Sequence, residues 1–299
     1  MLYIILATIT SVLMLVIVRL FQKFEAHTFY ALIANYISAF VCGISYTSFM
    51  LKQKNISLLQ IIFTLHSNVW ILTIIEGVLF ITVFYWIAQT TRFFGMAVAS
   101  VANKMSLVFP VISAAILFNE HLDLIRWTGL SMAVVSVYLV TYSEQIKSSF
   151  KNSRNIIFPL LVFIGSGVID SLINYGNKTF IDTSDKQFVF STFVYLFALI
   201  TGIMYLLFDN KKIFYVEKFN LLSTIILGTV LGIPNFFNLY FIIEALNTHI
   251  LPSGQIFLIL NLSNVIVSSL IGIIFFKEKL NWINWTGILF AIAAIYLVK

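Results

Sequence analysis

The segment Phe118-Asn-Glu-His-Leu-Asp-Leu-Ile-Arg-Trp-Thr-Gly129 returns near the end of the chain as Phe276-Lys-Glu-Lys-Leu-Asn-Trp-Ile-Asn-Trp-Thr-Gly287, with seven of twelve positions identical. Carrying the same offset of 158 residues through Val140 and Val298 gives 11 identities in 23. Composition alone would give roughly two or three. The chain therefore contains an internal duplication.

Composition indicates that most of the chain lies in lipid. Apolar residues make up 60% and charged residues 10%, and the mean hydropathy is +0.99, whereas soluble domains carry about 25% charged residues. The single cysteine, Cys42, excludes a disulfide framework and a cysteine metal site. The net charge of +6 comes from short turns between apolar runs. This favours lipid headgroups over nucleic acid as the partner of the basic residues.

Ten apolar runs are long enough to cross a bilayer, which takes about 20 helical residues. Transmembrane β-strands are excluded because the runs are about twice as long as such a strand and show no alternation of apolar and polar residues. We predict an all-α integral membrane protein, and the first run is expected to be a retained helix rather than a signal peptide. The predicted spans are 2–21, 28–50, 70–90, 95–118, 124–143, 156–176, 187–208, 221–244, 252–276 and 282–298.

The first four helices of each half also align, more weakly. An offset of 155 pairs Gly77 with Gly232 and Tyr85 with Tyr240. The duplicated unit therefore has five helices, and an odd number forces the second copy to enter the membrane in the opposite orientation. The expected organisation is ten transmembrane helices in two inverted five-helix repeats. Residues 1–143 and 156–299 form the repeats, and the polar stretch 144–155 links them.

A set of residues after the fourth helix of each half resembles a known family. The first half has Pro110, Glu120, Leu122, Trp127 and Gly129; the second has Glu278, Leu280, Trp285 and Gly287, with Ser268 at the proline position. Together with Gly232-Ile-Pro-Asn235, this pattern resembles the EamA-type members of the drug/metabolite transporter superfamily. The resemblance implies a secondary transporter, often an exporter, of substrates that range from amino acids to nucleotide sugars and drugs. Glu120 and Glu278 are interpreted as helix caps.

Orientation is predicted differently by two criteria. The side that would hold both termini has six Lys and Arg residues, and the opposite side has eleven. The positive-inside rule therefore places the termini outside, whereas the family resemblance implies cytoplasmic termini.

Lys104 is the most central basic residue of the predicted spans. It lies nine residues after Gly95, about 14 Å along the helix. The repeat equivalent of Asn103 is Asn261, but that of Lys104 is Leu262. Lys104 is expected to bind an anionic group of a substrate or to act as a coupling group. The alternative is a buried salt bridge that locks helix packing.

Asp170 lies in a polar stripe on the sixth span. Ser166, Asp170, Asn174 and Lys178 recur every four residues and therefore share one helix face. Such a stripe favours a wet cavity. Asp170 is the expected partner of Lys104 if the helices meet, and a proton site if they do not.

Other polar residues within spans complete the predicted site. Glu76 has Leu231 as its repeat equivalent, and Pro234 is followed by Asn235 and Asn238. The alternative for these amides, and for Asn261, is hydrogen bonding between helices. Glu244 is expected to be interfacial. The predicted substrate-binding residues are Lys104, Asn103, Asp170, Asn174, Glu76, Asn235, Asn238 and Asn261, with Asp170, Lys104 and Glu76 as coupling candidates.

The function expected from these residues is secondary active transport of a small polar or zwitterionic metabolite, such as an amino acid, by alternating access around a central cavity between the repeats. The family resemblance implies that the direction is export. The alternative is a lipid or lipid-linked carrier translocase with the same fold. An enzyme is not expected, because neither H-E-x-x-H nor G-x-S-x-G occurs. No catalytic residue, cofactor or metal is predicted. The expected partners are a small-molecule substrate, membrane lipids and a coupled proton or ion, in a monomer or homodimer of the cell membrane, which is the inner membrane for a bacterial source.

Overall fold

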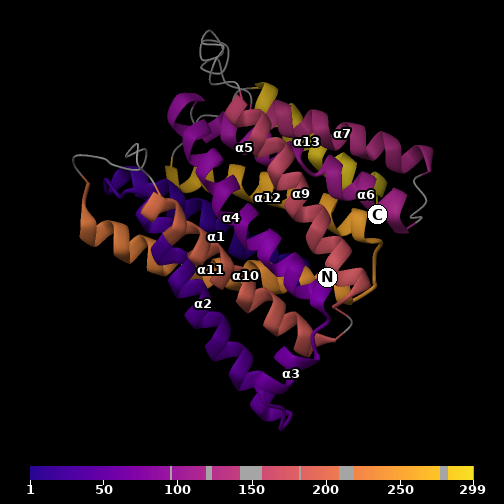
Figure 1. The fold of residues 1–299 in the computed structure, drawn as a ribbon. Helices are drawn as coiled ribbons and strands as arrows, with labels where there is room; N and C mark the ends of the chain where they lie inside the picture. Colours follow the sequence, from indigo (N-terminus) through magenta and orange to yellow (C-terminus); the bar gives the residue numbers. More distant parts are fainter. Residues whose placement is uncertain are drawn as a thin grey trace. The chain divides into compact units, whose positions relative to one another are not determined.

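A computed structural model describes residues 1–94, 96–118, 123–141, 157–181, 183–208, 219–276 and 282–298 (Figure 1). Every regular element in these ranges is a helix. The predicted linker 144–155 and the predicted caps Glu120 and Glu278 lie outside the described residues. The helices are α1 (Leu2–Lys23), α2 (Thr28–Gln53), α3 (Leu58–Thr64), α4 (Ser67–Phe94), α5 (Met96–Met105), α6 (Val108–Phe118), α7 (Leu124–Thr141), α9 (Ile157–Thr179), α10 (Ser184–Phe208), α11 (Leu221–Asn247), α12 (Ser253–Phe276) and α13 (Trp282–Val298).

Six of these helices are long and apolar enough to cross a membrane: α1, α2, α4, α9, α10 and α11. The remaining predicted spans correspond to shorter apolar helices within the described residues. On α1, the side chains of Ile5, Ile9 and Leu13 are exposed and recur every four residues. An apolar stripe of this kind is stable against lipid but not against water. The chain is therefore a multi-pass, membrane-associated helical protein.

The described helices form two compact units, and each unit uses both halves of the sequence. Unit 1 consists of Met1–Thr82 and Tyr175–Asn247, and unit 2 consists of Val83–Asn174 and Thr248–Lys299. Helices α4 and α9 each continue from one unit into the other. Each compact unit therefore contains helices from both predicted sequence repeats.

Close helix packing in unit 1 depends on glycines. On α11, Gly228 and Gly232 are four residues apart, and a Cβ atom at Gly232 would lie 2.5 Å from the carbonyl oxygen of Asn35 on α2. On α4, a Cβ atom at Gly77 would lie 2.8 Å from the backbone nitrogen of Ala198 on α10. Small residues at such positions let membrane helices approach closely. The repeat pair Gly77 and Gly232 therefore has the same packing role in both copies.

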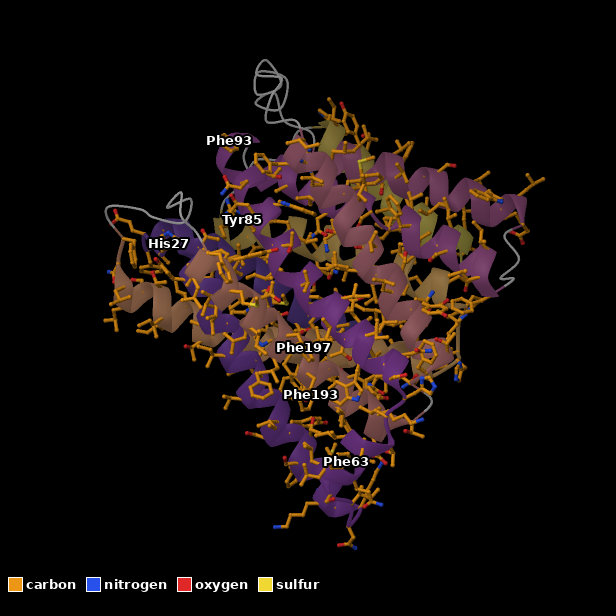
Figure 2. The ribbon with its side chains drawn as sticks, viewed as in Figure 1. His27, Phe63, Tyr85, Phe93, Phe193 and Phe197 are labelled. Carbon is orange, nitrogen blue, oxygen red and sulfur yellow. The ribbon has the colours of Figure 1, made fainter. Side chains whose placement is uncertain are left out.

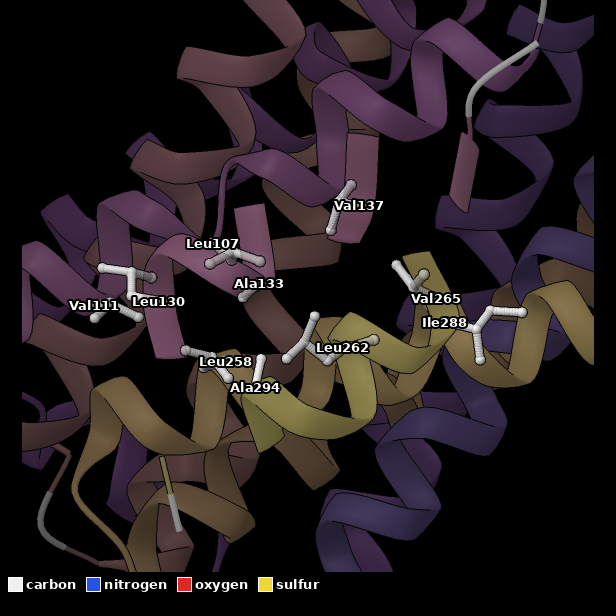
Figure 3. Packing of buried hydrophobic residues seen from close by; sticks show 11 residues of the cluster. Leu107, Val111, Leu130, Ala133, Val137, Leu258, Leu262, Val265, Ile288 and Ala294 are labelled. Atoms are coloured by element: carbon white, nitrogen blue, oxygen red, sulfur yellow. The ribbon is translucent and has the colours of Figure 1, made fainter. Parts of the chain in front are cut away.

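The core of unit 2 also pairs equivalent positions of the two sequence halves. Its buried side chains come from α6, α7, α12 and α13, and Leu107 between α5 and α6 adds one more (Figure 3). Three pairs in this core, Leu107 with Val265, Leu130 with Ile288 and Ala133 with Ala291, are related by the offset of 158 residues. In lipid, burial of apolar side chains between helices stabilises the fold through close packing rather than through the exclusion of water. The duplication therefore also accounts for the residue choice in this core.

The fourth predicted span, 95–118, is not a single helix. Helix α5 ends at Met105 and α6 begins at Val108. Proline clashes with the carbonyl group four residues before it, and for Pro110 that carbonyl belongs to Ser106, which lies at the break. In the second copy Ser268 replaces the proline and α12 runs unbroken from Ser253 to Phe276. The break therefore occurs in the copy that carries this proline, whereas α11 continues through Pro234.

Candidate functional site

Lys104 lies in the last turn of α5, directly before the break. Its side chain is buried, with 7% of its surface exposed. A helix that ends inside a protein leaves carbonyl groups without helical partners, and these carry partial negative charge. One of them, on Asn103, accepts a hydrogen bond from the Ser106 hydroxyl. The break therefore places a cation where the backbone favours positive charge.

Helix α9 passes the broken helix at close range. A Cβ atom at Gly167 would lie 2.5 Å from Cγ of Phe109 on α6, so only glycine fits there without a shift. Three residues further on, Asp170 interacts electrostatically with Lys104. The structure thus places the buried Lys104 near the half-buried Asp170, the two charges that the sequence singles out. It also places Asn103 beside Lys104 on α5.

The amides of unit 2 differ in how well their hydrogen bonds are satisfied. Asn174 is fully buried and donates to the Ser253 hydroxyl at 3.0 Å, but its Oδ1 atom has no hydrogen-bond partner among the described residues. Asn261 donates to the carbonyl oxygen of Phe257 in its own helix at 3.0 Å. Buried amide oxygens rarely stay unsatisfied. Asn174 is therefore the better candidate for a ligand contact.

Glu76 and Asn235 lie in unit 1, around Tyr195. Glu76 is fully buried and close enough to Tyr195 to interact with it electrostatically. The Tyr195 hydroxyl donates to the Asn235 carbonyl oxygen at 2.6 Å, and Asn235 Nδ2 donates to Asn35 Oδ1 at 3.0 Å. Asn235 therefore joins α11 to α2 and α10 through hydrogen bonds. This agrees with the alternative interpretation, in which these amides bond between helices and do not bind a ligand.

Asn238 does not join either group. Its Nδ2 atom donates to the carbonyl oxygen of Ala7 at 2.8 Å and to the Thr10 hydroxyl at 3.2 Å, both on α1. This contact ties α11 to α1. The structure thus gives Asn238 a packing role within unit 1.

We expect Asn238→Leu to lower the free energy of unfolding by about 1 kcal/mol, because interhelical hydrogen bonds in membranes contribute that order of energy. Ser45→Ala is the matched control, since the exposed Ser45 hydroxyl bonds only the carbonyl oxygen of Val41 in its own helix. The measurement is reversible unfolding in mixed micelles. A cost for Asn238→Leu no larger than that of the control would contradict the packing role.

Sequence reasoning missed Tyr195, Asn35 and Ser253. Nothing in the sequence singles out Tyr195, because tyrosine is common at membrane interfaces. In the structure it is fully buried, and its hydroxyl donates a hydrogen bond to a backbone carbonyl. Asn35, a lone amide near the middle of the second predicted span, was the available signal. The half-buried Glu244, expected to be interfacial, lies near Gln187 and Tyr240.

Comparison with known proteins supports the fold and assigns no activity. No protein-family profile matches the chain. The chain is 26% identical over 292 residues to an uncharacterized protein of Haemophilus influenzae, and the match covers 97% of this chain and 94% of that protein. A protein of known crystal structure has a similar fold, with a TM-score of 0.68 at 14% identity, covering 98% of this chain and 97% of that one. The likeness extends over nearly the whole length in both cases.

Proposed function

We propose that the protein is a secondary transporter of a small polar or zwitterionic metabolite, built from ten membrane helices in two inverted repeats of the EamA type. The observation that carries the proposal is the buried Lys104 at the end of α5, just before the break, with the half-buried Asp170 of α9 close enough to interact with it electrostatically. Broken membrane helices whose ends meet charged groups are typical of substrate and ion sites in transporters.

The energetic cost of the pair supports a functional role. A single charge at the bilayer centre costs at least about 2.5–3.5 kcal/mol, so such residues usually serve a transport path or a proton relay. Replacing a buried ion pair with apolar side chains is often neutral or stabilising. Packing alone would therefore not favour this pair over two apolar residues.

Packing of equivalent positions supports the inverted-repeat part of the proposal. Gly77 and Gly232 each mediate a close approach between a helix of one half and a helix of the other. In the proposed mechanism, alternating access follows from the movement of one set of helices against the other. Lys104 binds an acidic group of the substrate, and Asp170 and Asn174 accept hydrogen bonds from its donor groups.

Lys104→Met tests this proposal in proteoliposomes. We expect substrate uptake to fall at least about tenfold, because removing one partner of a buried charge pair costs 2–5 kcal/mol in binding. Lys52→Met is the matched control, since Lys52 is exposed near the end of α2. The substrate is first selected by thermal-shift screening of a metabolite panel. Unchanged rate and affinity in Lys104→Met would refute the proposed role.

A further inference from the structure

Helix α11 carries a row of aromatic side chains that ends at a carboxylate. Phe237, Tyr240 and Phe241 share one face of the helix, because residues three and four apart are neighbours on its surface. Glu244 follows on the same face, four residues after Tyr240 and three after Phe241. Phe237, Phe241 and Glu244 each keep part of their surface exposed. The carboxylate and the rings beside it are therefore accessible.

Helices α1 and α2 add tyrosine rings to this row. The ring of Tyr3 on α1 is stacked on that of Phe241, with 6.3 Å between the ring centroids. The ring of Tyr46 on α2 meets that of Tyr240 edge-on, at a centroid distance of 5.4 Å. Tyr3 also lies close enough to Glu244 to interact with it electrostatically. Three helices of unit 1 therefore form one aromatic patch beside the carboxylate. Its members are Tyr3, Tyr46, Phe237, Tyr240 and Phe241.

The basic side chain of Lys54 lies near Glu244 but is engaged with another carboxylate. Its Nζ atom donates to Asp185 Oδ1 at 2.6 Å. The Gln187 amide oxygen accepts a hydrogen bond from Asn247 Nδ2 at 2.7 Å, which ties the end of α11 to α10. Glu244 is thus held in place by its helix and can pair with a cation from outside.

The chemistry of this end of α11 favours a weakly hydrated cation. The face of an aromatic ring attracts positive charge, and the attraction increases when the cation gives up its water. The last carbonyl groups of the helix and the Glu244 carboxylate add negative charge at the same place. A divalent metal ion needs several protein ligands, and the part of the chain that the structure describes has no group of three or more His, Cys, Asp or Glu residues that could hold one. An organic ammonium ion fits better, because its alkyl groups contact the rings while its charge faces the carboxylate.

We propose that Glu244 and the aromatic patch bind an alkylammonium group. The site lies in unit 1, uses no residue of the Lys104 site and goes beyond the proposed transport function. The ammonium group belongs either to a free small molecule or to the headgroup of a membrane lipid, since both present the same chemistry. Glu244 supplies the opposite charge, and the patch supplies the ring faces.

Isothermal titration of the purified protein in dodecyl maltoside tests the site with two probes of equal shape. Choline carries a quaternary ammonium group, and 3,3-dimethyl-1-butanol has an uncharged carbon in its place. We expect choline to bind at least about tenfold more tightly, because only the cation gains from the carboxylate and the ring faces. Equal affinities, or no binding of choline, would overturn the proposal.

Two substitutions separate the contribution of the charge from that of the rings. Glu244→Gln keeps the size of the side chain and removes its charge, so we expect choline to bind at least about tenfold more weakly. Phe241→Leu keeps an apolar side chain without a ring face, and we expect a loss of about threefold to tenfold. Thermal unfolding shows whether each variant is folded. If one fails to fold, the other variant and the comparison of the two probes decide. A folded variant of either kind with wild-type affinity would contradict the site.

Glu25→Gln is the matched control at the opposite end of α11. Glu25 is exposed, and its carbonyl oxygen accepts a hydrogen bond from the Asn220 amide, just before the helix begins. Aromatic rings gather at this end too, since the centroid of the His27 ring lies 5.2 Å from that of Phe219 (Figure 2). Choline should bind this variant as it binds wild type. A loss as large as that in Glu244→Gln would mean that surface charge alone attracts choline, and the proposed site would be wrong.

Nanodiscs distinguish the two sources of the ammonium group. Choline binding is compared in phosphatidylglycerol nanodiscs and in nanodiscs of phosphatidylglycerol with an equal part of phosphatidylethanolamine, and empty nanodiscs give the background. Binding that is lost when phosphatidylethanolamine is present supports the lipid headgroup as the natural occupant. Equal binding in both supports a free ammonium compound. If the protein in phosphatidylglycerol binds no more choline than the empty nanodiscs do, the proposal fails.

Discussion

Gly232→Leu is expected to prevent unit 1 from folding. A Cβ atom at this position of α11 would lie 2.5 Å from the Asn35 carbonyl oxygen, 2.6 Å from Ser38 Cβ and 2.7 Å from the Ala39 backbone nitrogen. Two of these atoms belong to the backbone of α2, which cannot move aside as a flexible side chain can. Overpacking costs about 1–3 kcal/mol even where side chains yield. We therefore expect a loss of about 3 kcal/mol or more, a large fraction of the total stability.

Gly202→Ala provides the matched control for this experiment. A Cβ atom at Gly202 on α10 would meet side-chain carbons of Ile81 and Ile33 at 3.5–3.6 Å, which is ordinary contact. Alanine favours helix over glycine by roughly 0.5–1 kcal/mol, so this variant should be as stable as wild type or slightly more so. The measurements are the yield of monodisperse protein in size-exclusion chromatography and the unfolding midpoint in mixed micelles. A monodisperse Gly232→Leu protein of wild-type stability would contradict the packing argument.

These glycines show how far the duplication in the sequence predicts the fold. The offset of 155 residues pairs Gly77 with Gly232, and in the structure both residues lie where two helices cross closely. All ten predicted apolar runs contain helix, because a lipid-embedded backbone must satisfy its hydrogen bonds within the segment. Six of them qualify as spans by length and composition within the described residues. The partners of each helix depend on tertiary packing, which hydropathy does not encode.

Part of the candidate site could be predicted from the sequence, because polar side chains within apolar runs are easy to recognise. Lys104 and Asp170 stand out because charges are rare within apolar runs, and the structure places them close enough to interact electrostatically. Asn238 stands out by the same criterion, but it bonds Ala7 and Thr10 on α1. Polarity within a span thus indicates that a side chain needs a partner. It does not distinguish a neighbouring helix from a ligand.

The break between α5 and α6 was missed because hydropathy continues across it. Val108 and Phe109 are apolar and continue the run of residues 95–118. The signal was Pro110, since the clash of a proline ring with the carbonyl group of the fourth preceding residue is a local effect. In the second copy, Ser268 occupies the position equivalent to Pro110, and α12 is continuous there.

If the protein is the proposed transporter, Pro110→Ala is expected to reduce transport strongly while the protein still folds. The new N–H group at residue 110 can bond the Ser106 carbonyl, and without the ring clash α5 and α6 can join into one helix. The carbonyl groups at the end of α5 then bond within the helix and no longer favour the Lys104 ammonium group. The continuous helix also changes how Lys104 is aligned with Asp170. We expect uptake to fall about tenfold or more.

Hydrogen exchange at residues 106–109 measures the joining of the helices directly, because Pro110 itself has no amide hydrogen in wild type. In wild type these amides lie at the break, and protection should be low; in Pro110→Ala it should rise to the level of the flanking turns. Ser268→Ala is the matched control in α12, where the helix is already continuous, so neither protection nor transport should change. If Pro110→Ala gains protection and still transports at the wild-type rate, the break has no role in transport. If it loses transport without a gain in protection, the proline acts by packing, since Pro110 is buried in α6.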